Sequence, residues 1–312
     1  MRLSRQRDHR AGLVLGHLAA GRNQFIGGRF ASARSHLEEV LVLYDPISHR
    51  SLADQTGTHL HVVAQAHLEI VLFGLGFPDQ AMAHSSAAIA EARRLAHPPS
   101  LAAGLALGNV LVSLVGDNVT VDKWAHELVA VATEQGFPFR RAMGTVSRGW
   151  VKVKNGDVAE GMSLMRSGTA AYRATGAEVW MPHFIGLLAS GCEIAGQFDE
   201  AVTLVDEALQ MAERTGEHWF TAELHRHKGQ LLLRQGHAEA AETLYRKALG
   251  IAEEQRAKLW ELRATASLAR LRRDQGRREE ARNLLAPVYG WFTEGFGTPD
   301  LKDAKTLLDQ LV

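Results

Sequence analysis

The phrase GQFDEA, at residues 196–201, has near copies at residues 236–241 (GHAEAA) and 276–281 (GRREEA), at steps of 40 residues. Its first glycine belongs to a longer series in which the first step is 48 residues and the next five are 40 each. The series is Gly28, Gly76, Gly116, Gly156, Gly196, Gly236 and Gly276. A fixed period of this length is typical of proteins built from stacked copies of one supersecondary unit. The opening phrase therefore predicts a repeat protein.

Small side chains are common at two positions that flank each of these glycines. Seven residues before the glycine stand Gly21, Glu69, Asn109, Gly149, Ala189, Gly229 and Ala269, and five residues after it stand Ala33, Ala81, Val121, Gly161, Ala201, Ala241 and Ala281. Small residues on both sides of a turn allow two antiparallel helices to approach closely. A glycine at the turn can adopt the left-handed conformation that ends the first helix. Each unit is therefore predicted to be a helix hairpin.

The apolar spacing between the glycines is helical, as in Leu244, Tyr245, Ala248, Leu249 and Ala252, and strand alternation is absent. We predict an all-α fold, a right-handed α-solenoid of about seven helix-turn-helix units in a single domain over residues 1–312. The expected units are 11–50, 58–97, 100–136, 138–177, 178–217, 218–257 and 258–296, with a capping helix at 298–312. Thr298 is expected as its N-cap and Pro299 at its first position. A longer polar loop is expected around residues 43–57.

Composition places the chain among ordinary globular proteins. The 35 basic and 35 acidic residues balance, so nucleic acid is not an expected direct partner. A single cysteine, Cys192, excludes an internal disulfide framework and favours a reducing cytoplasm. The first ten residues are basic and polar, unlike a secretory signal, and the uncharged stretch Leu101–Gly116 is too short and too polar to span a bilayer. We therefore expect a cytoplasmic protein with no membrane contact.

The residues Gly229, Gly236, Ala241, Tyr245 and Ala248 together resemble the tetratricopeptide-repeat pattern, although the 40-residue period is longer than the standard unit. Further phrases resemble the C-terminal repeat region of large bacterial regulators that carry an ATPase module ahead of it, often behind a nucleotide cyclase or a winged-helix domain. These phrases are AAYRATGAE (170–178), AELHRHKGQLLL (222–233), LLAPVYGWFTEGF (284–296) and GTPDLKDAKTLLDQL (297–311). The resemblance implies a scaffold in bacterial signalling or transcription regulation, with an ATPase, cyclase or winged-helix regulator as a possible partner. This chain contains neither the ATPase nor the cyclase, so it implies neither activity here.

No pattern indicates catalysis, a cofactor or a metal. GHLAAGRN, at residues 16–23, lacks the Gly-Lys-Ser/Thr of a phosphate loop. The closely spaced histidines, such as His225 and His227, stand two residues apart and so point to different faces of a helix. Cys192 is expected to pack as a small buried hydrophobe, and adjacent carboxylates such as Glu279 and Glu280 as solvated surface. We therefore predict a non-catalytic protein.

The remaining feature is a surface. In the tetratricopeptide arrangement the first helix of each pair lines a concave groove, and the register from the turn glycine makes this groove apolar in units two and three, aromatic in unit four and basic in units six and seven. Such a groove fits an extended or helical protein segment with an apolar and an acidic half, whose carboxylates the arginines would bind. The predicted partner-binding residues are Phe73, Met143, Trp150, His183, Glu193, Arg226, Gln230, Arg234, Arg263, Arg270 and Arg273.

Two alternatives stay open at this point. The first is a sensor that binds a small molecule in the groove, in a compact pocket beside Trp150 and His183. The second concerns the tryptophans at 150, 180, 219, 260 and 291, which recur at about the unit spacing and can instead fill the core between helix pairs. A shift of one residue in the helical register would rotate the predicted face by about 100° and replace most of the listed residues.

Overall fold

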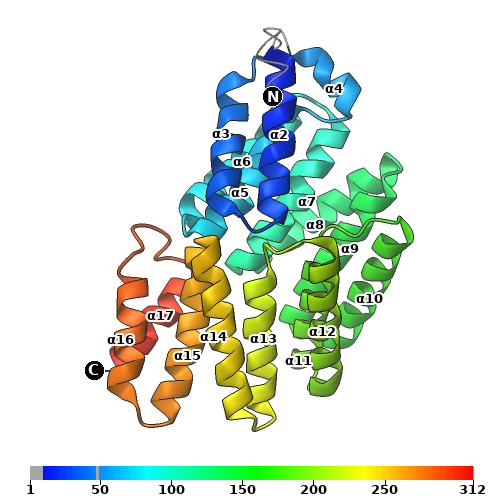
Figure 1. Cartoon of the computed structure of the whole chain (residues 1–312). Coiled ribbons are helices and arrows are strands. Elements are labelled where there is room, and N and C mark those ends of the chain that lie inside the picture. Colours follow the sequence, from blue (N-terminus) through cyan, green and yellow to red (C-terminus); the bar gives the residue numbers. More distant parts are fainter. Residues whose placement is uncertain (1–9, 47–48, 312) are drawn as a thin grey trace.

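The computed structural model describes residues 10–46 and 49–311, which form helices joined by short turns (Figure 1). In this part of the chain, seven antiparallel helix pairs follow one another. The first helices of the pairs are α2 (Arg10–Ile26), α5 (Leu60–Leu75), α7 (Pro98–Val115), α9 (Pro138–Lys154), α11 (Met181–Ile194), α13 (Thr221–Arg234) and α15 (Lys258–Asp274). The second helices are α3 (Phe30–Leu43), α6 (Pro78–Arg94), α8 (Asn118–Glu134), α10 (Val158–Ala174), α12 (Phe198–Thr215), α14 (Ala238–Gln255) and α16 (Arg278–Tyr289). The predicted all-α helical-repeat fold is confirmed.

The repeated glycines end the first helix of each pair. All seven have a positive φ, between 74° for Gly28 and 95° for Gly156, which is the left-handed region that side chains with a Cβ rarely adopt. The second break between pairs uses the same device at Gly136, Gly176 and Gly216. The turns are therefore fixed locally by residue type, as the sequence predicts.

The small residues that flank the turns mark real close approaches between helices. In the pair α9 and α10, a Cβ built on Gly149 would lie 2.7 Å from the backbone oxygen of Gly161, and a Cβ on Gly161 would lie 2.7 Å from that of Gly149. Only glycine fits at such a backbone contact. Glu69 and Asn109 occupy the first of these positions in units two and three, and both are almost fully buried.

Three local expectations need correction. The polar stretch around residues 43–57 contains a short helix, α4 (Arg50–Thr56), that ends at Gly57 in the left-handed conformation. α7 is long and apolar enough, by length and composition alone, to cross a membrane, because the helix begins at Pro98; 72% of it is buried inside the protein, as in a core helix. The third correction is partial: Thr298 is at the N-cap position of α17 (Pro299–Gln310) and Pro299 at its first position, both as expected, but the Thr298 hydroxyl donates to the Gly295 carbonyl and makes no cap hydrogen bond to α17. Outside the described residues lie positions 1–9, 47–48 and 312. The first of these segments is the basic one that we compared with a secretory signal.

The superhelix closes on itself. The turns that join the helices of the first pairs pack against the junctions between the last pairs, and Figure 1 shows α2, α5 and α6 standing above α13, α14 and α15. The His218 N–H donates to the Ile26 carbonyl at 2.7 Å, and the N–H groups of Asp79 and Gln80 donate to the Glu294 carboxylate at 3.0 and 3.1 Å. We call this contact between the first three and the last three pairs the seam.

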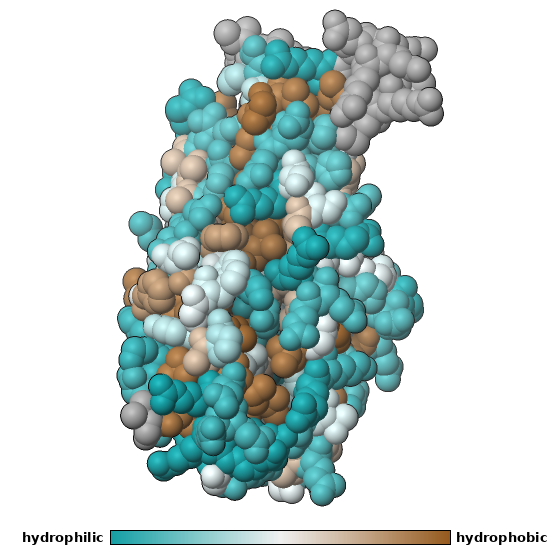
Figure 2. Space-filling model, turned by 60° about the vertical axis from the view of Figure 1, so that its left-hand side comes forward, coloured by the Kyte–Doolittle hydropathy of each residue, from teal (hydrophilic) through white to brown (hydrophobic). Residues whose placement is uncertain are grey.

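The outer surface facing the viewer in Figure 2 is mostly hydrophilic. Small hydrophobic areas interrupt it, and no broad apolar face is visible from this side. Among the described residues, Trp291 is one of few large hydrophobic side chains with substantial exposure. The apolar surface of the repeats is thus mostly used within the chain.

Candidate partner-binding groove

The inner faces of α5 and α7 are buried. Val63, Ala66, Ile70 and Phe73 on α5 are each at most 8% exposed, and Ala103, Ala106 and Val110 on α7 are buried as well. Phe73 packs edge-to-face on Trp260 of α15, with ring centroids 5.8 Å apart. The expectation that these helices form the apolar part of an open groove is therefore corrected. Closure of the superhelix covers their inner faces, because burying apolar surface lowers the free energy.

An aromatic cluster fills the centre of the seam. The Phe25 ring lies 5.7 Å from the Trp180 ring and 5.3 Å from the Trp219 ring, and Trp219 also contacts His183. The carboxylate of Glu217 accepts hydrogen bonds from the Trp180 backbone N–H at 2.9 Å and from the Trp219 indole N–H at 2.8 Å. Burial raises the pKa of Glu217 to about 7, since the charged form loses its hydration. Trp180, Trp219 and Trp260 are thus core residues.

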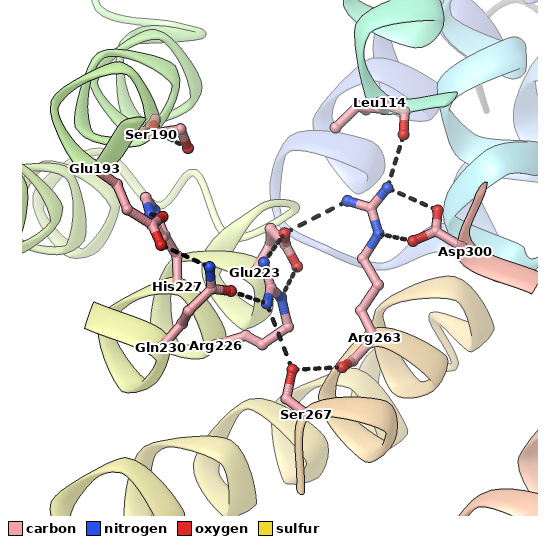
Figure 3. A network of polar contacts seen from close by, with 11 residues as sticks. Leu114, Ser190, Glu193, Glu223, Arg226, His227, Gln230, Arg263, Ser267 and Asp300 are labelled. Carbon is pink, nitrogen blue, oxygen red and sulfur yellow. Dashed lines mark hydrogen bonds and ion pairs between the residues drawn. The ribbon is translucent and has the colours of Figure 1, made fainter. Parts of the chain in front are cut away.

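Arg263 of α15 joins α17, α7 and α13 at the seam (Figure 3). Its guanidinium donates to both oxygens of Asp300 on α17, each at 2.8 Å, and to the Leu114 carbonyl on α7 at 2.7 Å. It also lies 3.4 Å from Glu223 of α13 and over the Phe73 and Trp260 rings. The planar guanidinium suits this set because it offers several donors in one plane and an apolar face.

A second chain of contacts runs along α13 (Figure 3). Arg226 donates to both oxygens of Glu223 at 2.8 Å and to the Gln230 side-chain oxygen at 2.9 Å. Glu193 of α11 accepts from Gln230 at 2.7 Å and contacts His227 and Arg234, each at 2.9 Å. We call these residues connected by hydrogen bonds and ion pairs the inner network. Its members are Leu114, Glu193, Glu223, Arg226, His227, Gln230, Arg234, Arg263, Ser267 and Asp300.

The electrostatics of the inner network are internally balanced. Burial alone would raise the pKa of Glu223, but Arg226 and Arg263 outweigh it and lower this pKa to about 2. For Arg263, burial would lower the pKa, yet Asp300 and Glu223 raise it above its usual value. The groove at units six and seven is thus less basic than its arginines suggest, because carboxylates of the same chain already occupy Arg226 and Arg263. The expectation that these two bind a partner's carboxylates is corrected for this conformation.

The structure sorts the predicted residues by accessibility. Phe73, Met143 and His183 are 0%, 1% and 0% exposed and present no surface, which corrects their expected place in an open groove. Glu193, Arg226, Gln230 and Arg263 are partly buried in the inner network. Trp150, Arg270 and Arg273 beside it are partly buried as well, and Arg234 is exposed. Arg270 forms no hydrogen bond or ion pair with any described residue.

Two small cavities open along the inner network. One, of about 120 Å³, is lined by residues that include Trp150, Ser190, Arg226 and Arg263, and the other, of about 220 Å³, includes Arg270, Asp300 and Asp303. His183 lines neither, so the expected compact pocket beside Trp150 and His183 does not form. Sites for drug-sized ligands usually measure about 300–1,000 Å³. The groove fits side chains of a partner better than a whole metabolite.

Sequence reasoning missed several members of the inner network. Leu114, which contributes its carbonyl, His227, Ser267 and Asp300 all take part, and none was predicted as a site residue. Asp300 was assigned only to the terminal helix, and a backbone carbonyl carries no signal in a sequence. In the sequence, the basic residues of α13 and α15 and the acidic Asp300 of α17 could have indicated such an ion pair, but not which residues form it.

The described residues offer little for catalysis. Within residues 10–46 and 49–311, no group of three or more His, Cys, Asp or Glu side chains lies close enough to hold a metal ion. Cys192 is buried, and burial raises its pKa to about 11, which keeps the thiol protonated and unreactive.

Comparison with known proteins identifies the repeat. A tetratricopeptide-repeat family profile matches residues 183–254, and a second matches residues 262–287. These two segments carry tetratricopeptide repeats. These repeats form a scaffold, and both matching profiles describe a repeat and not a catalytic family.

A curated relative of these tetratricopeptide repeats is an uncharacterized protein of Rhizobium meliloti (strain 1021). It is 26% identical over 246 residues, which cover 78% of this chain and 24% of the relative. The chain therefore spans about a quarter of the length of the curated relative it matches.

Solved structures share the fold. The Rap protein complexed with competence and sporulation factor gives a TM-score of 0.55 at 10% identity, covering 96% of this chain and 98% of that one. NprR in complex with its cognate peptide NprX gives 0.56 at 13% identity, with 96% and 82% covered. A tetratricopeptide repeat protein from Parabacteroides merdae gives 0.50 at 12% identity, with 96% and 99% covered. At these identities the likeness shows the fold alone.

Proposed function

We propose that this chain is a non-catalytic scaffold in bacterial signalling or transcription regulation that binds an extended or helical segment of a protein partner along its inner network. The observation that carries the proposal is a set of exposed or partly exposed residues in or beside that network, Trp150 on α9 and Arg234, Arg270 and Arg273 on α13 and α15. Tryptophan and arginine often supply much of the binding energy at protein interfaces.

Arg270 is the residue on which the proposal depends most. It lines the 220 Å³ cavity and forms no hydrogen bond or ion pair with a described residue, although the Asp303 carboxylate in the same cavity attracts it. Its neighbours Arg226 and Arg263 are already paired. Its guanidinium is therefore free to bind a carboxylate of the partner in a bidentate manner. Asp303 lines the same cavity and offers an acceptor for a basic group of the partner.

The comparisons lend support of two kinds. The Rap and NprR structures, which share the fold, hold a factor and a peptide. The relative from Rhizobium meliloti is much longer than this chain, which fits the hypothesis that an ATPase, cyclase or winged-helix regulator is the partner or part of the same assembly. The small groove cavities do not favour the alternative of a small-molecule sensor at this place.

The test is selection of peptides from a displayed random library on the wild-type chain, followed by fluorescence anisotropy with each selected peptide. We expect the selected peptides to carry acidic residues and to lose about tenfold or more in affinity with the Arg270→Glu variant. The matched control is Arg282→Glu on the outer helix α16, where the arginine is exposed and has no ion pair among the described residues. Peptides that bind wild type and Arg270→Glu equally would place the binding site elsewhere.

A further inference from the structure

A larger cavity lies at the seam, outside the groove. It measures about 580 Å³ and lies between the turn that joins α2 to α3 and the helices α12, α13 and α14. Gly27, Gly28 and the first turn of α3 form one side, and Thr221, His225 and Gln255 lie on the other. The His218 N–H donates to the Ile26 carbonyl across the seam here, and the Gln255 side chain donates to the His218 carbonyl beside it.

Several buried polar atoms of this cavity have no hydrogen-bond partner. His225 is only 8% exposed, and its Nδ1 is unpaired, as are the Thr221 hydroxyl and the Gln255 side-chain oxygen. Buried polar groups are nearly always satisfied. The Thr221 hydroxyl and a protonated ring nitrogen of His225 can donate to an anion, whereas the Gln255 oxygen can only accept a hydrogen bond. The Nε2 of His225 likewise has no partner among the described residues.

The first turn of α3 adds favourable electrostatics. No side chain caps it, and it contains no acidic residue, so the amides at the start of this 14-residue helix keep their partial positive charge. A helix start of this kind favours an anion, and the unpaired His225 supplies a separate polar contact.

Charged residues surround the opening. Arg29, Lys247 and Arg256 carry positive charge, and Glu213 and Glu254 carry negative charge, which leaves an excess of one positive charge. These five side chains are exposed, and among the described residues none of them forms an ion pair. Lys247 on α14 is one turn before Ile251, which also lines the cavity.

We propose that this cavity binds a small anion, a carboxylate or a phosphate, through the first turn of α3, His225 and Lys247. The bound anion contacts the first and the sixth helix pairs at once and therefore stabilises the closed superhelix. The site is separate from the groove in which a protein partner is proposed to bind.

The experiment measures binding of citrate and of inorganic phosphate to the full chain by calorimetric titration and by thermal unfolding, against sodium chloride of equal ionic strength. We expect at least one of the two anions to bind and to raise the unfolding temperature of the wild type. In Lys247→Glu the affinity falls by about tenfold or more, and His225→Leu also weakens binding. Lys247 is exposed, so its variant folds even where a change at buried His225 disturbs packing.

Two variants serve as controls. Lys123→Glu makes the same charge change on an exposed lysine of α8, and Arg270→Glu alters the groove; both are expected to bind the anion as the wild type does. A response to citrate alone identifies a carboxylate site, a response to phosphate alone a phosphate site, and a response to both a general anion site. Failure of both anions to bind, or equal affinity in the wild type and Lys247→Glu, would overturn the proposal.

Discussion

The helices α5 and α15 meet across the seam, and they leave water in different ways. α5 contributes Phe73 and other apolar side chains, whose burial needs only contact. α15 contributes Arg263, whose burial needs Asp300 and the Leu114 carbonyl at hydrogen-bond distance. The comparison teaches that one repeat architecture can close by two kinds of packing, of which the apolar kind tolerates change and the charged kind depends on exact partners.

The largest expected effect comes from removing the charged side of this contact. Arg263→Ala leaves Asp300 and the Leu114 carbonyl without their donor in a mostly buried place, and breaking an ion pair there costs up to about 3–5 kcal/mol of unfolding free energy. Urea unfolding followed by circular dichroism measures it. Arg270→Ala, in the same helix but without a partner, is the control and should cost about 1 kcal/mol or less. Equal losses of unfolding free energy in Arg263→Ala and Arg270→Ala would contradict the claim that the charged contact depends on its exact partners.

Two buried glutamates, Glu217 and Glu223, sharpen the comparison through opposite pH dependence. Glu217 lies among tryptophans, so its folded pKa of about 7 exceeds the usual 4.5, and the unfolding free energy falls by about 3 kcal/mol as pH rises from 4.5 to 7. Glu223 lies between arginines, so its folded pKa of about 2 is below 4.5, and about 3 kcal/mol of stability is lost as pH falls from 4.5 to 2.

The measurement is the unfolding free energy of wild type, Glu217→Gln and Glu223→Gln across this pH range. Glu217→Gln should flatten the dependence above pH 4.5, and Glu223→Gln the dependence below it. If both variants reduce the pH dependence of the unfolding free energy on the same side of pH 4.5, the assignment of one glutamate to an apolar and the other to a charged environment is wrong.

The smallest expected effect tests the tolerance of the apolar side. Phe73→Leu keeps an apolar side chain against Trp260 and should cost about 1 kcal/mol. Arg263→Lys keeps the positive charge, yet it should lower the unfolding free energy more than Phe73→Leu does. An ammonium cannot bind Asp300 in a bidentate manner while reaching the Leu114 carbonyl. Urea unfolding of the two variants decides the order, and a larger loss for Phe73→Leu would reverse the proposed difference.

The sequence was sufficient for the paired helices and the turns within the pairs, since Gly156 or Gly236 fixes its turn through its own backbone conformation. The exposure of the groove could not be predicted in the same way. Phe73 is buried by Trp260, and Arg263 by Leu114 and Asp300, and these contacts arise only when the superhelix closes. A register argument within one unit contains no information about a unit far along the chain. The helix at Arg50–Thr56 was missed because its polar residues, next to Pro46, resemble a loop.

The closed superhelix is the central claim, and a distance across the seam tests it most directly. Spin labels would be placed on cysteines introduced at Ser32 of α3 and Glu254 of α14, two exposed residues that line the same cavity, in a chain with Cys192→Ala. Pulsed electron spin resonance should give one short, narrow distance in the wild-type background and a broader, longer distribution in Arg263→Ala. A long or broad distribution in the wild-type background would show an open superhelix in solution and contradict the account.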